Sequence, residues 1–469
     1  MKKGLLLLLL LALVCFFLIG SILPYTSQPT LSPETQAHFS PSSCYGQGIG
    51  CDRAAMIDDN QLALELRLQM IAHAQEQILL STFDFHSDQA GTDLLAALLD
   101  AGQRGVQVRL LVDGLSALLR MERNPLFYAL SSHPNIEIRI YNPIQFWKPW
   151  NWMGRLHDKY LLIDHTAYLL GGRNCFNAFL GQYSSGANRD RDVLVYNADG
   201  AKDSSVYQVE RYYQAISALD CCRLFHNDSD LAQRSAVRKA RDTLGQRLAQ
   251  LKQTYPACYA APCDYAGLTL PTRKITLLSN PTQVAVKEPV LFYQLMALCQ
   301  DGKREVLLHT PYVIANDWML EQLRAIGKKG QLLLNSAATN GNPFAASDYS
   351  RHKQALVDTG LELHEYIGEH SYHGKSIAID DRLAVVGSFN LDMRSAYLDT
   401  ELMLAIDSPE VTAALKASMA TLDAQAAVVA DAEHYASLPK GMAEPHLPLG
   451  RHVLQFLTGW ALELGRFLL

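Results

Sequence analysis

The sequence predicts an α/β protein made of two similar halves, related by a pseudo-twofold axis, with an N-terminal transmembrane anchor. Three observations support this prediction. A pattern of apolar strand, amphipathic helix and second strand occurs twice in the chain. A string of polar residues recurs after each copy of that pattern. A long apolar run occupies the N-terminus, and 469 residues leave ample length for two domains beyond it.

The apolar run predicts an uncleaved membrane anchor over residues 1–25. It extends from Leu5 to Leu23, which is 19 residues and close to the length that crosses a bilayer as a helix. Cleaved signal peptides have shorter apolar regions followed by a small-residue cleavage site, and no clean site of that kind follows here. Because Lys2 and Lys3 precede the run, we expect the rest of the chain to face outward, on the periplasmic or extracellular side of the cell membrane.

Each half begins with a β-α-β unit. EQILLSTFDF, DLLAALLDAGQRG and VQVRLLVDG occupy residues 76–114, and REVLLHTPYV, WMLEQLRAIGKKG and QLLLNSAATNG occupy residues 304–341. This order implies parallel strands joined by a right-handed crossover, and a third strand follows from Ile136 and from Leu361. The predicted division is a linker at 26–55, a first domain at 56–215, a connecting helical segment at 216–270, a second domain at 271–430 and an apolar tail at 431–469.

Each half then contains one copy of the pattern HxKxxxxDxxxxxxG[GS]xN. RLHDKYLLIDHTAYLLGGRN in the first half and SYHGKSIAIDDRLAVVGSFN in the second fit it without a gap. At ordinary residue frequencies, six fixed positions do not recur twice by accident. The aligned residues are His157, Lys159, Asp164, Gly171, Gly172 and Asn174 in the first copy, and His373, Lys375, Asp380, Gly387, Ser388 and Asn390 in the second.

These polar residues predict a phosphodiester site between the halves. On a strand, residues two apart point to the same face, so each half presents an imidazole beside a lysine. Gly172 and Ser388 allow close approach of the backbone to a phosphate, and Asn174 and Asn390 supply amide donors. Two halves around a pseudo-twofold axis place two histidines on opposite sides of one phosphorus. One histidine attacks to form a phosphohistidine and the other serves as acid and base, so no metal or other cofactor is expected.

A carboxylate partner is expected for each histidine, because a nucleophilic imidazole has to present one tautomer. Asp192 in RDRDVLVY and Glu401 in DTELMLAI each open an apolar strand downstream of a histidine, and we predict that they orient these rings. Asp190 is the alternative to Asp192, because the sequence does not determine which of the two faces inward. For Asp164 and Asp380 the alternative to a place in the site is a structural role, pairing with backbone or a cation.

Composition argues against several other functions. The chain has 41 Lys and Arg against 47 Asp and Glu, so no global basic field exists to hold nucleic acid. It has no GxxxxGK[ST] loop and no GxGxxG opening a helix, so ATP or NAD chemistry is not expected. Two cysteine pairs are close in sequence, and they predict either short-loop disulfides or buried free thiols rather than a zinc site. They are Cys44 with Cys51 and Cys258 with Cys263.

The two polar motifs resemble the HKD signatures of the phospholipase D superfamily, over about residues 61–407. Within it the sequence is most similar to bacterial cardiolipin synthases, through TPYV at 310–313, GSFNLDMRS at 387–395 and TEL at 400–402, although it has one N-terminal apolar segment rather than two spans. The resemblance implies two phospholipase D-like α-β-α sandwich halves and a metal-independent phosphohistidine mechanism. It places the nucleophile at His157, with His373 as acid and base, and adds Asp164 and Asp380 to the catalytic residues.

Two apolar segments favour contact with lipid. FWKPWNW precedes His157 and suits a headgroup interface, where Lys148 and Arg155 would attract anionic lipids, and a buried aromatic cluster at the pocket rim is the alternative. Near the C-terminus, apolar residues at helical spacing predict a helix that lies either in a membrane interface or in the core. The residues are Trp147, Trp150 and Trp152 in the first segment, and Val453, Leu457, Trp460, Leu464 and Phe467 in the second.

The predicted function is a phosphatidyl transferase of the cardiolipin synthase type. It would move a phosphatidyl group from phosphatidylglycerol, or from phosphatidylethanolamine, to the hydroxyl of another phospholipid at the membrane surface. A hydrolytic phospholipase D releasing phosphatidic acid is the nearest alternative, because water and an alcohol resolve the same intermediate. A phosphodiesterase or nuclease of the superfamily would need a basic groove, so nucleic acid is not an expected partner. A non-catalytic membrane scaffold would be expected to have lost a motif histidine or lysine.

Overall fold

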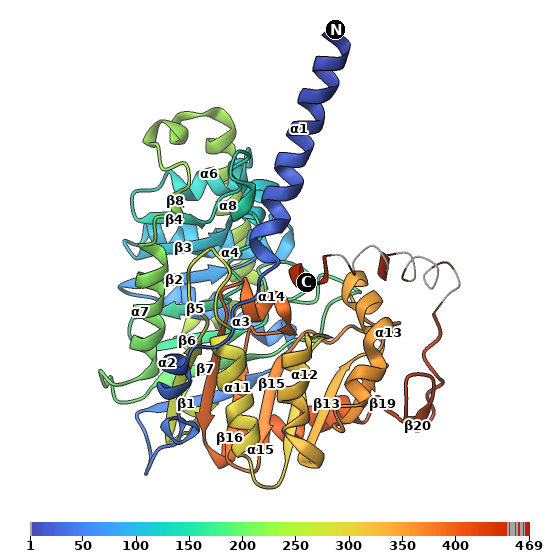
Figure 1. The fold of residues 1–469 in the computed structure, drawn as a ribbon. Coiled ribbons are helices and arrows are strands. Elements are labelled where there is room, and N and C mark those ends of the chain that lie inside the picture. Colours follow the sequence, from blue (N-terminus) through green and yellow to red (C-terminus); the bar gives the residue numbers. More distant parts are fainter. Residues whose placement is uncertain (1, 448–449, 451–454, 456–457, 460–462, 464) are drawn as a thin grey trace.

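The two halves contain sheets with the same strand order (Figure 1). The computed structural model describes residues 2–447, 450, 455, 458–459, 463 and 465–469. The first sheet has the order β8-β4-β3-β2-β5-β6-β7-β1-β9, and the second has the order β10-β18-β16-β15-β11-β13-β14-β19-β20. Starting from β1 and from β10, the strands correspond one to one through β4 and β14. The predicted α/β fold with two similar halves is therefore confirmed.

The first half is built on a mixed sheet. Its strands are β1 (Asp52–Ile57), β2 (Gln77–Thr82), β3 (Gln107–Asp113), β4 (Ile136–Tyr141), β5 (Tyr160–Ile163), β6 (Ala167–Gly171), β7 (Asp192–Asn197), β8 (Cys222–Leu224) and β9 (Leu270–Pro271). Its longer helices are α3 (Asn60–His73), α4 (Gln89–Gln103), α6 (Pro125–Ser131), α7 (Ser205–Ser217) and α8 (Ser235–Thr254). α8, from the segment that we predicted to connect the halves, packs against α4 and α6 of the first half.

The second half repeats this plan. Its strands are β10 (Lys274–Ser279), β11 (Val306–His309), β13 (Gly330–Asn335), β14 (Glu362–Tyr366), β15 (Lys375–Ile379), β16 (Leu383–Gly387), β18 (Leu402–Asp407), β19 (Ala426–Val429) and β20 (Tyr435–Ser437). Its helices include α11 (Val290–Asp301), α12 (Asp317–Arg324), α13 (Pro343–Val357), α14 (Met393–Tyr397) and α15 (Pro409–Asp423). β12 (Val313–Ile314) and β17 (Leu391–Asp392) form a separate two-stranded sheet.

The β-α-β units form because apolar strands alternate with a capped amphipathic helix. In the first unit β2 pairs with β3 in parallel, and α4 crosses between them. The Asp88 side chain caps α4 by accepting from the Gly91 N–H at 3.1 Å. The chain turns back at Gly105, whose φ of 99° is a left-handed conformation that glycine adopts without steric cost.

Buried side chains form one core in each half and a third core between them. The core of the first half lies under α3, α4 and α8, and that of the second half lies under α11, α12 and α13. The third combines the inner sheet faces of both halves with α7 and α15, for example Leu162 and Val195 with Val386 and Leu404. This shared apolar core is what brings the two polar motifs to a common position.

The N-terminal helix α1 (Lys2–Ile22) projects away from both halves (Figure 1). Residues Lys3–Tyr25 are long and apolar enough to cross a membrane, and their most apolar 18-residue window has a mean hydropathy of 3.1 and no buried residue. The side of the membrane on which the two sheets lie stays a prediction.

The predicted C-terminal helix falls largely outside the described residues, which omit Val453, Leu457, Trp460 and Leu464. Phe467, the remaining residue of that stripe, packs against the core of the second half together with Leu468 and Leu469. All nine cysteines, which lie within the described residues, are free thiols, and neither of the two short-loop disulfides is formed.

Candidate active site

Both motif histidines lie on extended backbone at the junction of the halves. His157 precedes β5, and its backbone N–H donates to Thr400 Oγ1 of the second half at 3.1 Å. His373 precedes β15, and its N–H donates to the Arg189 carbonyl of the first half at 2.7 Å. The neighbouring residues form isolated β-bridges across the junction, at Leu156 with Thr400 and at Arg189 with Tyr372. The backbone N–H of each histidine is thus bonded to a residue of the opposite half, to a hydroxyl for His157 and to a carbonyl for His373.

The carboxylates that contact the histidines also come from the opposite half. His157 Nδ1 lies 2.7 Å from Glu401 Oε1, and His373 Nδ1 lies 2.7 Å from Asp190 Oδ2. Both carboxylates are fully buried, whereas the imidazoles remain 13% and 22% exposed. The sequence predicts that each carboxylate orients the histidine of its own half, and this pairing is wrong, because the segment that carries each carboxylate lies against the histidine segment of the other half.

Asp192 does not contact a histidine, so the prediction that it orients one is also wrong. Its buried carboxylate forms ion pairs with Arg67 at 2.9 Å and Arg173 at 3.2 Å. Sheet register explains the difference. Gly171 pairs with Asp192, and the equivalent Gly387 pairs with Met403. Glu401 lies two residues before Met403, and the residue two positions before Asp192 in the first half is Asp190.

Replacing Asp192 with asparagine is expected to lower the free energy of unfolding by about 3–5 kcal/mol, because it leaves two buried arginines without their counter-charge. Urea unfolding of the full chain in detergent measures this loss. Asp199→Asn, at an exposed position, is the matched control and should leave stability unchanged. A loss below about 1 kcal/mol for Asp192→Asn would contradict the structural role.

Gly172 and Ser388 hold the carboxylates rather than a phosphate, which corrects their predicted role. The buried Ser388 hydroxyl donates to Glu401 Oε2, and Ser395 donates to Oε1 at 2.7 Å. At the equivalent Gly172, an added Cβ would lie 2.3 Å from Asp190 Oδ1, so only glycine leaves room for that carboxylate. The backbone N–H groups of both residues are already bonded within the sheets. Both residues are therefore positioning residues.

The motif lysines lie against their own histidines. Lys159 Nζ donates to the His157 carbonyl at 2.6 Å, and Lys375 Nζ lies 3.1 Å from His373 Nε2. An aromatic edge contacts each imidazole, Phe83 at a ring distance of 5.4 Å from His157 and Phe179 at 5.0 Å from His373. The expected imidazole beside a cation is thus present in both halves, and the two phenylalanines, which we had not predicted, restrict the imidazole rings.

The two asparagines differ in what their amides have left to offer. Asn174 Oδ1 accepts from the Asp84 N–H at 3.2 Å, so the Asn174 amino group points away from Asp84. Asn390 Nδ2 donates to the Tyr312 hydroxyl at 3.2 Å, and its buried Oδ1 has no partner within the described chain. An amide oxygen or amino group without a protein partner is available to a ligand.

Asp164 and Asp380 both bond to backbone, which agrees with the structural role that was the alternative to a place in the site. Both have positive φ values, 48° and 51°, in the turns that follow β5 and β15. Asp164 accepts from the N–H groups of residues 75–77, and Asp380 accepts from those of 303–305. Each carboxylate therefore ties the far end of the motif strand to the start of the neighbouring strand.

Burial sets the protonation of the site. It lowers the pKa of Lys159 to about 8 and that of Lys375 to about 7. It also lowers the pKa of His373 to about 4 and that of His157 well below its usual value, with the nearby lysines acting in the same direction. Both imidazoles are consequently neutral at pH 7, which is the form that can attack phosphorus.

The two orienting carboxylates are unequal. Burial raises the pKa of Glu401 to about 7. Burial opposes ionisation of Asp190 as well, but the charges of His373, Lys375 and Arg173 outweigh it and hold the pKa of Asp190 below its usual range. The carboxylate facing His373 is therefore the more firmly ionised, and it favours an imidazolium on His373 once substrate adds negative charge nearby.

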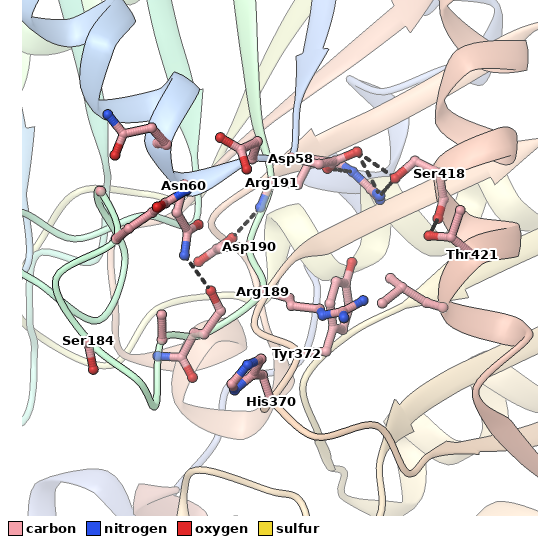
Figure 2. A pocket seen from close by; sticks show the side chains of 17 residues that line it. Asp58, Asn60, Ser184, Arg189, Asp190, Arg191, His370, Tyr372, Ser418 and Thr421 are labelled. Carbon is pink, nitrogen blue, oxygen red and sulfur yellow. Dashed lines mark hydrogen bonds and ion pairs between the residues drawn. The ribbon is translucent and has the colours of Figure 1, made fainter. Parts of the chain in front are cut away.

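A polar cavity of about 470 Å³ borders Asp190 on the side of α3 and α15 (Figure 2). Buried Arg191 lines it and bonds to Asp58 at 2.6 Å, Ser376 at 2.7 Å and Ser418 at 2.6 Å. These bonds join the two halves beside the Asp190–His373 pair.

Among the described residues, no group of three or more His, Cys, Asp or Glu side chains is arranged to hold a metal ion.

The segment before His157 differs from expectation at Arg155. Its guanidinium is buried, lies 3.4 Å from Asp113 Oδ1 and donates to the Asn142 carbonyl at 3.0 Å, so it cannot reach lipid headgroups. Lys148 is exposed. Trp147 and Trp150 are also exposed, which excludes the buried aromatic cluster for these two side chains.

Comparison with known proteins gives consistent matches over both halves. A family described as cardiolipin synthase, PLD-like domain, matches residues 68–215 and 295–422. Cardiolipin synthase C of Escherichia coli is 26% identical over 389 residues, covering 74% of this chain and 79% of that protein. Cardiolipin synthase B of Escherichia coli is 25% identical over 334 residues, covering 71% and 70%. The crystal structure of phosphatidylserine synthase from Haemophilus influenzae shares the fold, with a TM-score of 0.61, 17% identity and coverage of 89% and 95%.

Proposed function

This chain belongs to the cardiolipin synthase family of PLD-like domains, a family of phospholipase D-type phosphatidyltransferases, and from that membership we propose that it transfers a phosphatidyl group to a second phospholipid, giving cardiolipin. The observation that carries the proposal is the pair of neutral imidazoles, each held at Nδ1 by a buried carboxylate from the other half. With Nδ1 held in this way, Nε2 is the nitrogen of each ring that the proposal assigns to the reaction. Two such nitrogens are what in-line displacement at phosphorus requires.

In the proposed reaction His157 Nε2 attacks the phosphorus of phosphatidylglycerol. His373 takes up a proton at Nε2 as the negatively charged phosphate binds. The P–N bond then forms as the bond to the headgroup oxygen breaks, and His373 gives that proton to the oxygen so that glycerol leaves. His373 then removes the proton from the hydroxyl of the second lipid, whose oxygen attacks phosphorus and breaks the P–N bond. Lys159, Lys375, Asn174 and Asn390 provide donors for the equatorial phosphate oxygens, where negative charge concentrates.

The membrane supports a lipid substrate in this proposal. α1 keeps the site next to a bilayer, where phosphatidylglycerol and phosphatidylethanolamine are abundant donors of a phosphatidyl group. With Lys2 and Lys3 on the cytoplasmic side, the site lies on the periplasmic or extracellular side of the cell membrane. Hydrolysis to phosphatidic acid is the competing outcome, because water can replace the acceptor hydroxyl.

The test is incubation of the purified full chain with phosphatidylglycerol in detergent micelles containing EDTA, followed by mass spectrometry. We expect cardiolipin and free glycerol in equal amounts. Phosphatidic acid without cardiolipin would make the protein a hydrolase, and no turnover on phosphatidylglycerol or phosphatidylethanolamine would refute the proposal. His370→Ala, which removes a partly exposed histidine with no hydrogen bond or ion pair to the described residues, is the matched control and should retain full activity.

Inhibition by sulfate is expected to weaken at least tenfold as the pH rises from 6 to 9. Sulfate mimics the substrate phosphate and keeps its charge over this range, whereas Lys375 and Lys159 lose theirs as the pH passes their pKa values of about 7 and about 8. Glu401, with a pKa of about 7, becomes negative over the same range and acts in the same direction. The inhibition constant measured against pH checks this, and a flat profile would show that the lysines stay charged.

A further inference from the structure

A patch of exposed apolar side chains lies on the first half, beside the end of α1. It consists of two segments, residues 115–119 and 146–150, which we call the docking face. The exposed fractions of its large apolar side chains range from 37% to 67%, in Leu115, Leu118, Leu119, Phe146, Trp147 and Trp150. The segments are adjacent, because Leu118 lines one groove of about 260 Å³ with Pro143 and Ile144. A contiguous exposed patch of this kind marks an interaction surface.

The docking face is continuous with the candidate membrane span. Phe17 of α1 lies 4.5 Å from the Phe146 ring and 6.2 Å from the Trp147 ring, and Phe16 lies 6.3 Å from the Trp150 ring. Tyr25, at the end of that span, bonds to the Trp150 carbonyl. If α1 crosses a bilayer, these contacts hold the docking face where the helix enters it, which is the depth that tryptophan prefers.

The charges on the face suit an anionic lipid surface. Arg120 and Lys148 are exposed beside the apolar side chains, and neither forms an ion pair within the described residues. Glu122, the acidic residue next to Arg120, is already paired with His226 at 2.9 Å. A bilayer containing phosphatidylglycerol would attract the two cations that remain.

One buried carboxylate fixes the docking face relative to the site. Asp113 Oδ1 accepts from the Leu115 N–H at 2.7 Å, and its Oδ2 accepts from the Leu156 N–H at 2.9 Å. Asn142 braces the other segment, donating to the carbonyls of Asn151 at 2.6 Å and Gly154 at 2.8 Å. The docking face and the backbone of His157 therefore move as one unit.

We propose that the docking face inserts into the boundary between headgroups and acyl chains of the bilayer that α1 crosses, and so sets the depth and orientation of the site at the lipid surface. α1 alone supplies a tether, whereas a second contact beside it determines which way the domains face. The proposal rests on the proposed function for its substrate, but insertion itself can be measured without turnover.

The first test uses the full chain in phosphatidylglycerol and phosphatidylethanolamine vesicles whose acyl chains are brominated, which quenches tryptophan that reaches them. We expect Trp147→Phe to lower the fraction of the tryptophan emission that the brominated acyl chains quench. Trp318→Phe is the matched control, because Trp318 packs on Phe292 in the second half, 5.2 Å between ring centres, and should lose only unquenched emission. Quenching that is unaffected by Trp147→Phe would overturn the proposal, including the case in which a protein covers the face instead.

The second test compares two forms of substrate. The double variant Leu118→Ser with Leu119→Ser is expected to turn over phosphatidylglycerol in vesicles at least fivefold more slowly, and to retain full activity on short-chain phosphatidylglycerol dissolved as monomers. Ile49→Ser, at an apolar residue that is 88% exposed, is the control and should change neither. Equal losses on both substrates would place these leucines in the support of the site and overturn the proposal. Absence of turnover in the unmodified protein would refute the proposed function alone, since quenching still reports insertion.

Discussion

Replacing His157 with alanine is expected to lower turnover of phosphatidylglycerol by about 10⁴-fold, because the proposed nucleophile is lost and no other imidazole can replace it. His373→Ala is expected to be comparably inactive on this substrate, since glycerol is a poor leaving group without an acid. Steady-state product formation measures both losses, and an unchanged melting temperature shows that the variants remain folded. Activity of His157→Ala within tenfold of the unmodified protein would rule out the phosphohistidine.

A phosphatidyl ester of p-nitrophenol separates the two roles. This leaving group departs without protonation, so His373→Ala should release about one equivalent of p-nitrophenol per site and then stop, with the phosphatidyl group retained on His157. His157→Ala should show no burst. A burst in His157→Ala and none in His373→Ala would assign the nucleophile to His373 and exchange the two roles.

Glu401→Gln and Asp190→Asn are each expected to lower turnover of phosphatidylglycerol by about 10²-fold to 10³-fold, because each leaves one imidazole without its orienting partner. The pairing of each carboxylate with the histidine of the other half can be tested directly in the His373→Ala variant with the p-nitrophenol ester. There Glu401→Gln should slow the burst, since it acts on His157, whereas Asp190→Asn should leave the burst rate unchanged, since its histidine is absent.

The rate of that burst, followed by stopped-flow absorbance, decides between crossed and same-half pairing. Slowing by Asp190→Asn with no effect of Glu401→Gln would mean that each carboxylate serves the histidine of its own half in solution. Asp199→Asn, which removes a carboxylate at an exposed position, is the control and should leave the burst rate unchanged.

Local sequence patterns were sufficient to predict the two halves. Apolar strands alternating with a capped helix predicted the β-α-β units, and the duplicated polar motif showed that the halves meet at one site. Both features are determined by residues that lie close together in the sequence. His157 with Lys159 and His373 with Lys375 lie together for the same reason, since two-residue spacing on extended backbone fixes their common side.

Features that depend on strand pairing and on contacts between residues far apart in the sequence could not be read in this way. The choice between Asp190 and Asp192 follows from sheet register, and counting back from the apolar run selects the wrong carboxylate. Ser388 appeared to face a phosphate, but its hydroxyl is directed to Glu401 by a strand pairing that the sequence does not display. Arg155 looked like a surface cation because the buried Asp113 that neutralises it lies far away in the sequence.

The exchange of partners across the junction makes catalytic competence indivisible. A half folded by itself would keep its imidazole and its lysine, but the carboxylate at Nδ1 and the acceptor of the histidine N–H would be missing. Any loosening of the shared core would therefore disturb both histidines together rather than one at a time. In the proposed mechanism, a half that is not docked on the other would therefore lack the contacts that the first chemical step requires.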